Sequence, residues 1–191
     1  MTLMYLSLAA SVLFAASELN PIVQSQASTK PAGIVADPKG VRDFDFERGE
    51  WRVHHRVKRA GQNEWTEFEG TCRNRELIDG SANVEEHTFV RPSGVTYGIA
   101  MRAFDSKSEQ WAIWWVDGRD PHGTLDPPVK GRFENGIGTF YSDYVADGKP
   151  MRVRFVWSHI TQKSARWEQA SSSDAGKTWQ TNWIMEFNRI L

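Results

Sequence analysis

The 191-residue sequence has a single cysteine, Cys72, so no disulfide can form within the chain. The fold must therefore be held by packing, for which a hydrophobic fraction of 40% in a chain of this length is sufficient. In the pattern Phe68-x-Gly70-x-Cys72 a lone cysteine is typical of a small buried hydrophobe rather than a nucleophile.

Charge of one sign and long apolar runs are also lacking. Lys and Arg total 23 against 24 Asp and Glu, which gives a net charge of -1, and neither sign forms a long run. This balance offers no electrostatic footprint for nucleic acid. No segment approaches the roughly 20 apolar residues that a membrane-spanning helix needs. We therefore expect neither a nucleic-acid partner nor a stable membrane span.

Motifs for nucleophilic catalysis and for metal binding are missing as well. The sequence has no Gly-x-Ser-x-Gly elbow. His54 and His55 are adjacent on a predicted strand and point to opposite faces, while His87, His122 and His159 have no ligand-spaced neighbours. We predict no protein-ligated metal and identify no cofactor.

The N-terminus differs from the rest of the chain. Residues 1–17 are mostly apolar, end in small residues and resemble a secretory signal peptide, although the first residues contain no Lys or Arg. Residues 18–40 are rich in Ser, Gln, Pro, Ala and Gly, which is typical of a disordered linker. We expect export to the periplasm or the exterior, with a folded domain over 41–191; the cleavage site stays open between positions 17 and 27.

From residue 41 onward the sequence predicts an all-β domain. Runs rich in Val, Ile, Thr and aromatics alternate with turn signals at a spacing of about 8 to 12 residues. The predicted strands cover 51–59, 64–75, 83–90, 95–104, 110–117, 129–134, 137–146, 151–160, 165–172 and 179–188. Asn135-Gly136 and Asp147-Gly148 favour two-residue hairpins, and closing a series of hairpins removes both edge strands. We predict a single up-and-down antiparallel barrel of about ten strands, with a β-sandwich as the alternative.

Alternation along these strands predicts which side chains face the lumen. The first strand places Trp51, Val53, His55 and Val57 inside, and the last places Trp179, Thr181, Trp183, Met185 and Phe187 inside. Trp65 and Phe68 are an odd number of residues apart, so we expect a bulge between them. The strand 111–117 is apolar on both faces and cannot be oriented from its sequence.

Several segments resemble a known protein group. The order Phe44-Asp-Phe-Glu-Arg-Gly-Glu-Trp51 is similar to the Gly-x-Trp opening of lipocalin-like calycin barrels, where the Trp plugs one end. With Asp126-Pro-Pro-Val-Lys-Gly-Arg-Phe133 and Arg166-Trp-Glu-Gln-Ala170, followed by Asn182-Trp-Ile-Met185, the region 44–189 resembles the bacterial DUF1579 group. The resemblance implies a calycin-like cavity and no established reaction. Nitrobindin-like calycins hold haem through a histidine, so haem stays an outside possibility.

The segment Ser172-x-Asp174-x-Gly176-x-Thr178-Trp179 matches the Asp-box pattern of sialidase-type propellers. A propeller requires several repeats, and this pattern occurs once. We interpret it as a structural hairpin in which the Asp side chain bonds nearby backbone N–H groups.

The nine Trp and ten Phe are the feature that a function has to explain. Our leading hypothesis is a barrel that binds a small, largely apolar or amphipathic molecule in a Trp-rich lumen. The loop after Asp117 would form a mouth where Arg119 clamps an acidic group, or else a solvated loop with internal ion pairs. The predicted ligand-binding residues are Tyr97, Trp115, Asp117, Arg119, Phe140, Ser142, Tyr144, Phe155, Trp157, Trp167, Gln169, Thr181 and Trp183.

Two other functions remain open. An enzyme of isomerase, cyclase or lyase type would use Glu86, which register with Ile99 places on the lumen face, with His55 as its partner. Glu86 at the barrel mouth, or a register shifted by one residue, would remove this site. A structural barrel with a filled core would use the same aromatic residues for packing alone. We favour binding over catalysis.

Overall fold

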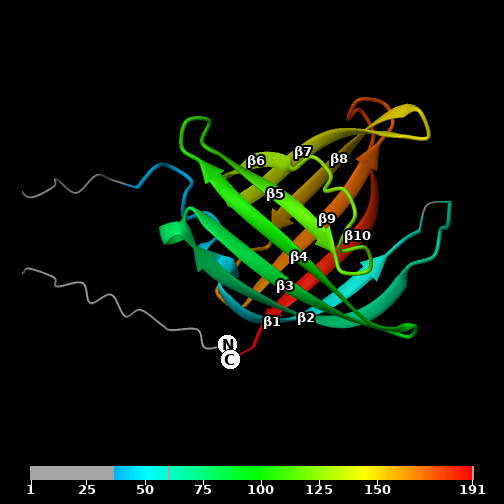
Figure 1. Ribbon diagram of the computed structural model, residues 1–191, viewed down its shortest axis with the longest axis horizontal. Coiled ribbons are helices and arrows are strands. Elements are labelled where there is room, and N and C mark those ends of the chain that lie inside the picture. The colour runs from blue at the N-terminus through cyan, green and yellow to red at the C-terminus, as the bar shows by residue number, and fades with distance from the viewer. Residues whose placement is uncertain (1–36, 60, 191) are drawn as a thin grey trace, which may run out of the picture. The chain divides into compact units, whose positions relative to one another are not determined.

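The computed structural model describes residues 37–59 and 61–190, so the predicted signal peptide and most of the predicted linker lie outside the described residues. Two short 3₁₀ helices and ten strands make up the domain (Figure 1). The elements are η1 Asp45–Glu47, β1 Gly49–Val57, β2 Thr66–Leu77, η2 Ile78–Gly80, β3 Ala82–Arg91, β4 Gly94–Asp105, β5 Gln110–Asp117, β6 Val129–Glu134, β7 Ile137–Ala146, β8 Lys149–Ser158, β9 Ser164–Ser172 and β10 Gln180–Arg189.

The strands form one closed antiparallel barrel. Each strand pairs with its neighbours in sequence, and β1 pairs with β10 to complete the ring. This order confirms the predicted up-and-down barrel and excludes the sandwich. Among the described residues, no helix is long and apolar enough to cross a membrane.

The two tight hairpin turns have the predicted geometry. Asn135 and Gly136 have φ values of 51° and 77°, so both central residues adopt the positive φ that a type I′ turn requires. Glu134 consequently lies opposite Ile137, which fixes the register of β6 and β7. The same geometry at Asp147-Gly148 fixes β7 against β8. Alternation from these turns places Ser142, Tyr144, Phe155 and Trp157 on the inner face, as their prediction as ligand-binding residues requires.

Two local predictions are wrong. β2 runs in unbroken register with β1 and alternates inward through Phe68, so no bulge is present, and Trp65 lies before the strand with Lys58 over its ring. The irregularity lies in β10 instead, where the register shifts between Thr181 and Trp183. That shift turns the preceding residues outward.

The neighbours of Thr181 and Trp179 show that both residues face outward. Thr181 lies opposite Ala170, which pairs with Arg154 on the outer wall. The ring of Trp179 packs with Tyr141, and the Arg154 guanidinium lies 4.4 Å from its centroid. Thr181 and Trp179 therefore do not face the lumen, in contrast to the prediction.

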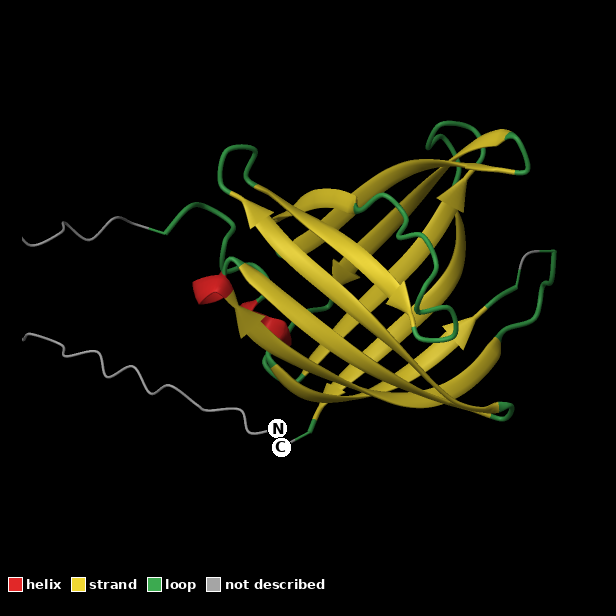
Figure 2. Ribbon diagram, viewed as in Figure 1, coloured by secondary structure: helices red, strands yellow, loops and turns green. Residues whose placement is uncertain are grey.

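One end of the barrel is filled by side chains. Both 3₁₀ helices lie at this end (Figure 2). The Phe44 ring, just before η1, meets Trp111 and Phe133 edge-on with centroids 5.0 Å apart in each case. Trp51 is fully buried, and its Nε1 donates to the Glu47 backbone oxygen at 2.7 Å. We call Phe44, Trp51, Trp111 and Phe133 the aromatic plug. It joins β1 to η1 and the residue just before it.

Candidate functional site

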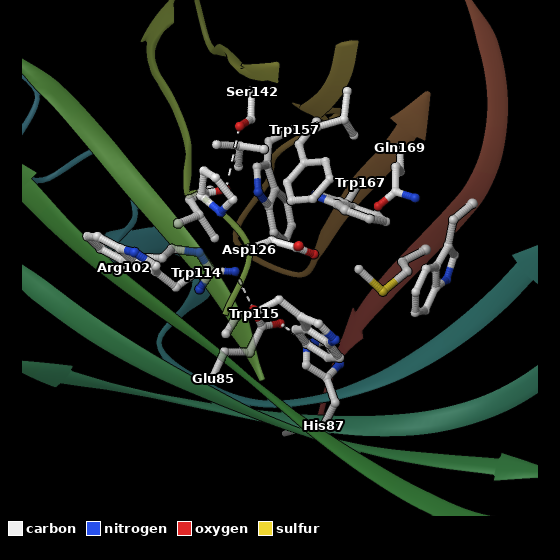
Figure 3. Close-up of a pocket in the computed structure, with 18 of the residues that line it drawn as sticks. Glu85, His87, Arg102, Trp114, Trp115, Asp126, Ser142, Trp157, Trp167 and Gln169 are labelled. Atoms are coloured by element: carbon white, nitrogen blue, oxygen red, sulfur yellow. Dashed lines mark hydrogen bonds and ion pairs between the residues drawn. The ribbon is translucent and has the colours of Figure 1, made fainter. Parts of the chain in front are cut away.

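The remainder of the barrel interior contains a cavity of about 290 Å³. Aromatic rings from several strands make up a large part of its wall (Figure 3). The lining residues are Glu85, His87, Phe89, Ala100, Arg102, Ile113, Trp114, Trp115, Asp126, Pro127, Val129, Ser142, Tyr144, Val153, Phe155, Trp157, Trp167, Gln169, Trp183 and Met185. The interior is thus only partly filled, which argues against a structural barrel with a packed core.

The cavity reaches the barrel wall between β5 and β6. These strands pair only from Trp111 to Ile113, so the later residues of β5 have no ladder partner on this side. The loop 118–128 follows β5, and its Asp126 and Pro127 line the cavity together with Trp114. Ser142 Oγ donates to the Pro127 carbonyl at 3.5 Å. The loop beside this gap therefore forms part of the cavity wall.

A buried ion cluster lies between the aromatic plug and the cavity. Arg102 Nη1 lies 2.7 Å from Glu47 Oε2, and Arg102 Nη2 binds Glu85 Oε2. Asn74 Nδ2 donates to Glu47 at 3.1 Å, and Asn83 Oδ1 accepts from Arg102 at 3.0 Å. Arg102 therefore connects η1 on one side with β3 on the other.

The two glutamates differ in charge state. Burial raises the pKa of Glu47 well above its usual value, even though Arg102 opposes the shift. Burial also acts to raise the pKa of Glu85, but Arg102 and His87 outweigh it and hold that pKa well below its usual value. A protonated Glu47, an ionised Glu85 and a charged Arg102 make the cluster neutral, which is the condition for burying it at moderate cost.

Two further polar side chains join Glu85 on the lumen side. Cys72 Sγ donates to Glu85 Oε1 at 3.1 Å, and His87 Nε2 lies 2.9 Å from the same oxygen. Burial raises the pKa of the Cys72 thiol well above its usual value, so the thiol carries its proton when no metal is bound. Cys72 is therefore buried, as the sequence predicted.

His55 faces the interior, as predicted, but it does not line the cavity. Its ring stacks on Phe68 with centroids 4.7 Å apart, and Trp183 Nε1 donates to its Nδ1 at 3.3 Å. Burial lowers the pKa of His55 to about 3, and the positive charges of His87, Arg91 and His54 act in the same direction while Glu85 opposes them. His55 is therefore neutral in the folded protein at all but strongly acidic pH.

This pKa predicts an acid-dependent loss of stability. The unfolded chain binds a proton at His55 near pH 6.5 that the folded protein binds only near pH 3, so stability falls as pH drops through this interval. Between pH 7.5 and 5.5 we expect His55 to remove about 1.4 kcal/mol from the free energy of unfolding. In urea unfolding, the free energy of unfolding of His55→Gln should fall by about 1.4 kcal/mol less than that of wild type between pH 7.5 and 5.5. The exposed neighbour substitution His54→Gln should retain the His55 contribution, and equal slopes for His55→Gln and wild type would contradict the assignment.

The structure places eight of the predicted ligand-binding residues in the cavity wall. They are Trp115, Ser142, Tyr144, Phe155, Trp157, Trp167, Gln169 and Trp183. Trp115 also orients β5. It lies opposite the buried Ala100 and shares one face of the strand with the buried Trp111 and Ile113, so this face is the inner one.

The other predicted ligand-binding residues lie elsewhere. Phe140 is fully buried against Phe44 in the aromatic plug, outside the cavity. Tyr97 is 62% exposed on the outer wall, and Thr181 also faces outward. Arg119 Nε donates to Asp117 Oδ1 at 2.9 Å, and neither residue lines the cavity. This pair matches the alternative of a solvated loop with its own ion pair.

The predicted lumenal Glu86 is wrong by one residue. It does lie opposite Ile99, as expected, but both side chains are exposed on the outer wall. Glu85 and His87 point inward instead. Glu86 and His55 are therefore not brought together, and the carboxylate that lies in the lumen is that of Glu85.

Comparison with known proteins supports the fold. No family model and no curated protein matches the chain. Among solved structures, the S-type phycobiliprotein lyase CPES from Guillardia theta is similar, with a TM-score of 0.55 and 10% identity over 78% of this chain and 90% of that one. A de novo designed fluorescence-activating β-barrel gives a TM-score of 0.43 and 12% identity over 76% of this chain and 95% of that one. At this identity, the likeness to the lyase shows a shared barrel fold.

Proposed function

We propose that this chain binds a small, largely apolar molecule in the barrel lumen. The observation that carries the proposal is the aromatic-walled cavity of about 290 Å³ that the aromatic plug leaves unfilled. Specific small-molecule sites are typically concave and apolar, with a few polar groups that fix orientation. A barrel fold shared with the phycobiliprotein lyase supports the proposal at the level of fold only.

The polar groups of the cavity wall would recognise a polar substituent of the ligand. Glu85, His87 and Arg102 lie together toward the plug, while Asp126 belongs to the loop 118–128. Gln169 lines the wall with its Nε2 bonded to Asn182 Oδ1 at 3.1 Å, which leaves its carbonyl oxygen as the acceptor for a ligand. We therefore infer an amphipathic ligand whose apolar body packs on the tryptophans.

Two further proposals concern the protein family and the cellular location of the chain. We propose that the chain belongs to the DUF1579 group, on the strength of the Gly-x-Trp opening and the segments between residues 126 and 185. We also propose that residues 1–17 direct export.

Acid–base catalysis is the second candidate function. Its proposed residues are Glu85 and His87, because these line the cavity with 2.9 Å between the carboxylate and the imidazole. A carboxylate that orients an imidazole is a common arrangement for proton transfer. Glu85→Gln would then abolish turnover of a bound molecule while leaving binding measurable.

Binding can be tested with the neutral fluorescent probe N-phenyl-1-naphthylamine. Occupation of the cavity should raise probe emission and quench the tryptophans of the wall, since Trp115, Trp157 and Trp183 lie around it. Ala100→Phe should weaken probe binding by at least about tenfold, equivalent to about 1.4 kcal/mol, because its side chain would enter the cavity. Ala103→Phe on the same strand faces the outer wall and serves as the matched control. No saturable signal with wild type, or equal binding by both variants, would contradict a lumenal site.

A further inference from the structure

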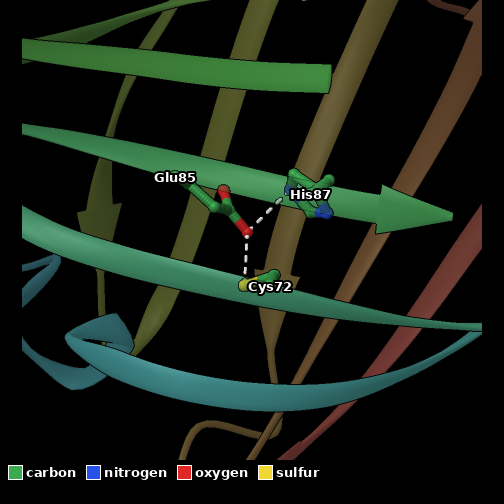
Figure 4. A group of neighbouring side chains, drawn as sticks. All are labelled: Cys72, Glu85 and His87. Atoms are coloured by element: carbon green, nitrogen blue, oxygen red, sulfur yellow. Dashed lines mark hydrogen bonds and ion pairs between the residues drawn. The ribbon is translucent and has the colours of Figure 1, made fainter. Parts of the chain in front are cut away.

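We propose that Cys72, Glu85 and His87 form a binding site for a divalent transition-metal ion such as Zn²⁺. All three side chains are buried, and one donor atom from each lies within 4.8 Å of the other two (Figure 4). The inference is independent of the proposed apolar ligand, because it depends only on these side chains and their neighbours.

Strand pairing brings the three residues to one face. Cys72 on β2 lies directly opposite His87 on β3, and Glu85 is two residues before His87, so all three side chains project into the lumen. The backbone of two adjacent strands therefore fixes their relative positions, and no loop has to close to assemble the site.

The donor set matches the chemistry of zinc. Thiolate sulfur, imidazole nitrogen and carboxylate oxygen are its usual protein ligands, at about 2.0 to 2.3 Å from the metal. The present contacts from Glu85 Oε1, 3.1 Å to Cys72 Sγ and 2.9 Å to His87 Nε2, are close to the separation of ligands around one tetrahedral ion. Small side-chain rotations would admit the ion between the three donors. As the sulfur–metal bond forms, the thiol proton is released to solvent.

Neighbouring charges are arranged to hold the carboxylate. Arg102 Nη2 binds Glu85 Oε2, which leaves Oε1 directed at Cys72 and His87. Hydrogen bonds of this kind from outside the ligand set typically orient a metal-binding carboxylate. Arg102 also contacts Glu47 at 2.7 Å, so a hydrogen-bond partner for its guanidinium remains when Glu85 binds metal.

The cavity gives the site an approach and an open coordination position. Glu85 and His87 both belong to the cavity wall, whereas the third ligand, Cys72, lies behind them. Three protein ligands and one open position are typical of a catalytic rather than a structural zinc site. A metal held here would meet a donor atom of a molecule in the lumen.

Cobalt titration of the full chain tests the site, because Co²⁺ bound to thiolate absorbs in the near-ultraviolet. We expect a saturable thiolate–cobalt band in wild type that excess Zn²⁺ removes. Cys72→Ala and His87→Gln should both lose the band. Glu86→Gln and His54→Gln should keep it, because these side chains lie on the outer wall. His54 also contacts Glu67 and Glu69, so its substitution shows whether ions gather at that surface cluster instead.

Absence of the band in wild type would overturn the proposal whatever the variants do. A band that survives in folded His87→Gln, with folding checked by far-ultraviolet circular dichroism, would also overturn it. Since either variant could disturb the buried network, thermal unfolding of wild type provides a second measurement. Zn²⁺ at saturating concentration should raise its melting temperature, and an unchanged temperature would count against the site. Probe binding in the absence of metal keeps failure of this proposal distinguishable from failure of the lumenal ligand site.

Discussion

Replacing Arg102 by methionine is expected to lower the free energy of unfolding by about 3–5 kcal/mol. The guanidinium is 3% exposed and contacts Glu47 and Glu85, so its removal leaves an ionised carboxylate buried without a counter-ion. It also lies 4.8 Å from the Phe44 ring centroid, which adds a lost cation–π contact. Guanidinium chloride unfolding of wild type and variant would measure the difference.

A matched surface substitution separates this effect from loss of an arginine in general. Arg73 on β2 has a 67% exposed side chain and lies 3.6 Å from Glu50. Arg73→Met should cost no more than about 1 kcal/mol. Adding Glu85→Gln to Arg102→Met should recover part of the loss, because it removes the uncompensated charge. A cost below about 1 kcal/mol for Arg102→Met alone would show that the cluster is not a buried ion network.

The barrel could be predicted because short segments of the sequence determine its turns and its strand register. Asn135-Gly136 and Asp147-Gly148 require positive φ at both central residues, and a two-residue turn leaves only one register for the strands on either side. From β6 to β8 the side chains then alternate without interruption. Phe155 and Trp157 could therefore be placed in the interior from the sequence alone.

The faces of β3 and β4 could not be predicted by the same argument. Their register is as expected, but Tyr97 and Met101 are exposed while Glu85 and Arg102 are buried. The prediction assumes that the more apolar face of a strand points inward. In β3 and β4 the charged residues of the ion cluster point inward instead, so the apolar residues between them face outward. A second hydrogen-bond partner of the buried Arg102 is Glu47, which is 55 residues away in the sequence and belongs to a different element. No pattern within either strand contains that pairing.

The metal-ligand candidates Cys72, Glu85 and His87 could not be predicted for a related reason. Spacing along a single strand does not reveal them, because Cys72 and His87 meet across two strands. The local signal was Glu85-x-His87, whose two residues share one face of a strand. Its neighbour Glu86 competed for the same role, and only the orientation of β3 decides between them.

Replacing Trp51 by alanine is expected to destabilise the protein by about 3–5 kcal/mol, because no alternative packing is available for a fully buried ring of this size. The indole meets Phe187 edge-on at 6.2 Å, and the Arg189 guanidinium lies 4.0 Å from its centroid. Trp51→Phe should cost less, because it keeps an aromatic ring and loses the Nε1 bond to the Glu47 carbonyl. Urea unfolding would measure both variants.

Trp65 provides the control for this series, since it lies outside the barrel with Lys58 4.8 Å from its ring, and Trp65→Ala should cost no more than about 1 kcal/mol.

The Trp51 bond to Glu47 also predicts that the stability effects of Trp51 and of the ion cluster are coupled. Trp51 holds the backbone of Glu47, while Arg102 holds its carboxyl group. Once either contact is lost, Glu47 is no longer fixed, so the Trp51→Phe and Arg102→Met double variant should lose less stability than the sum of the single variants. Strict additivity would mean that the plug and the ion cluster stabilise the barrel independently.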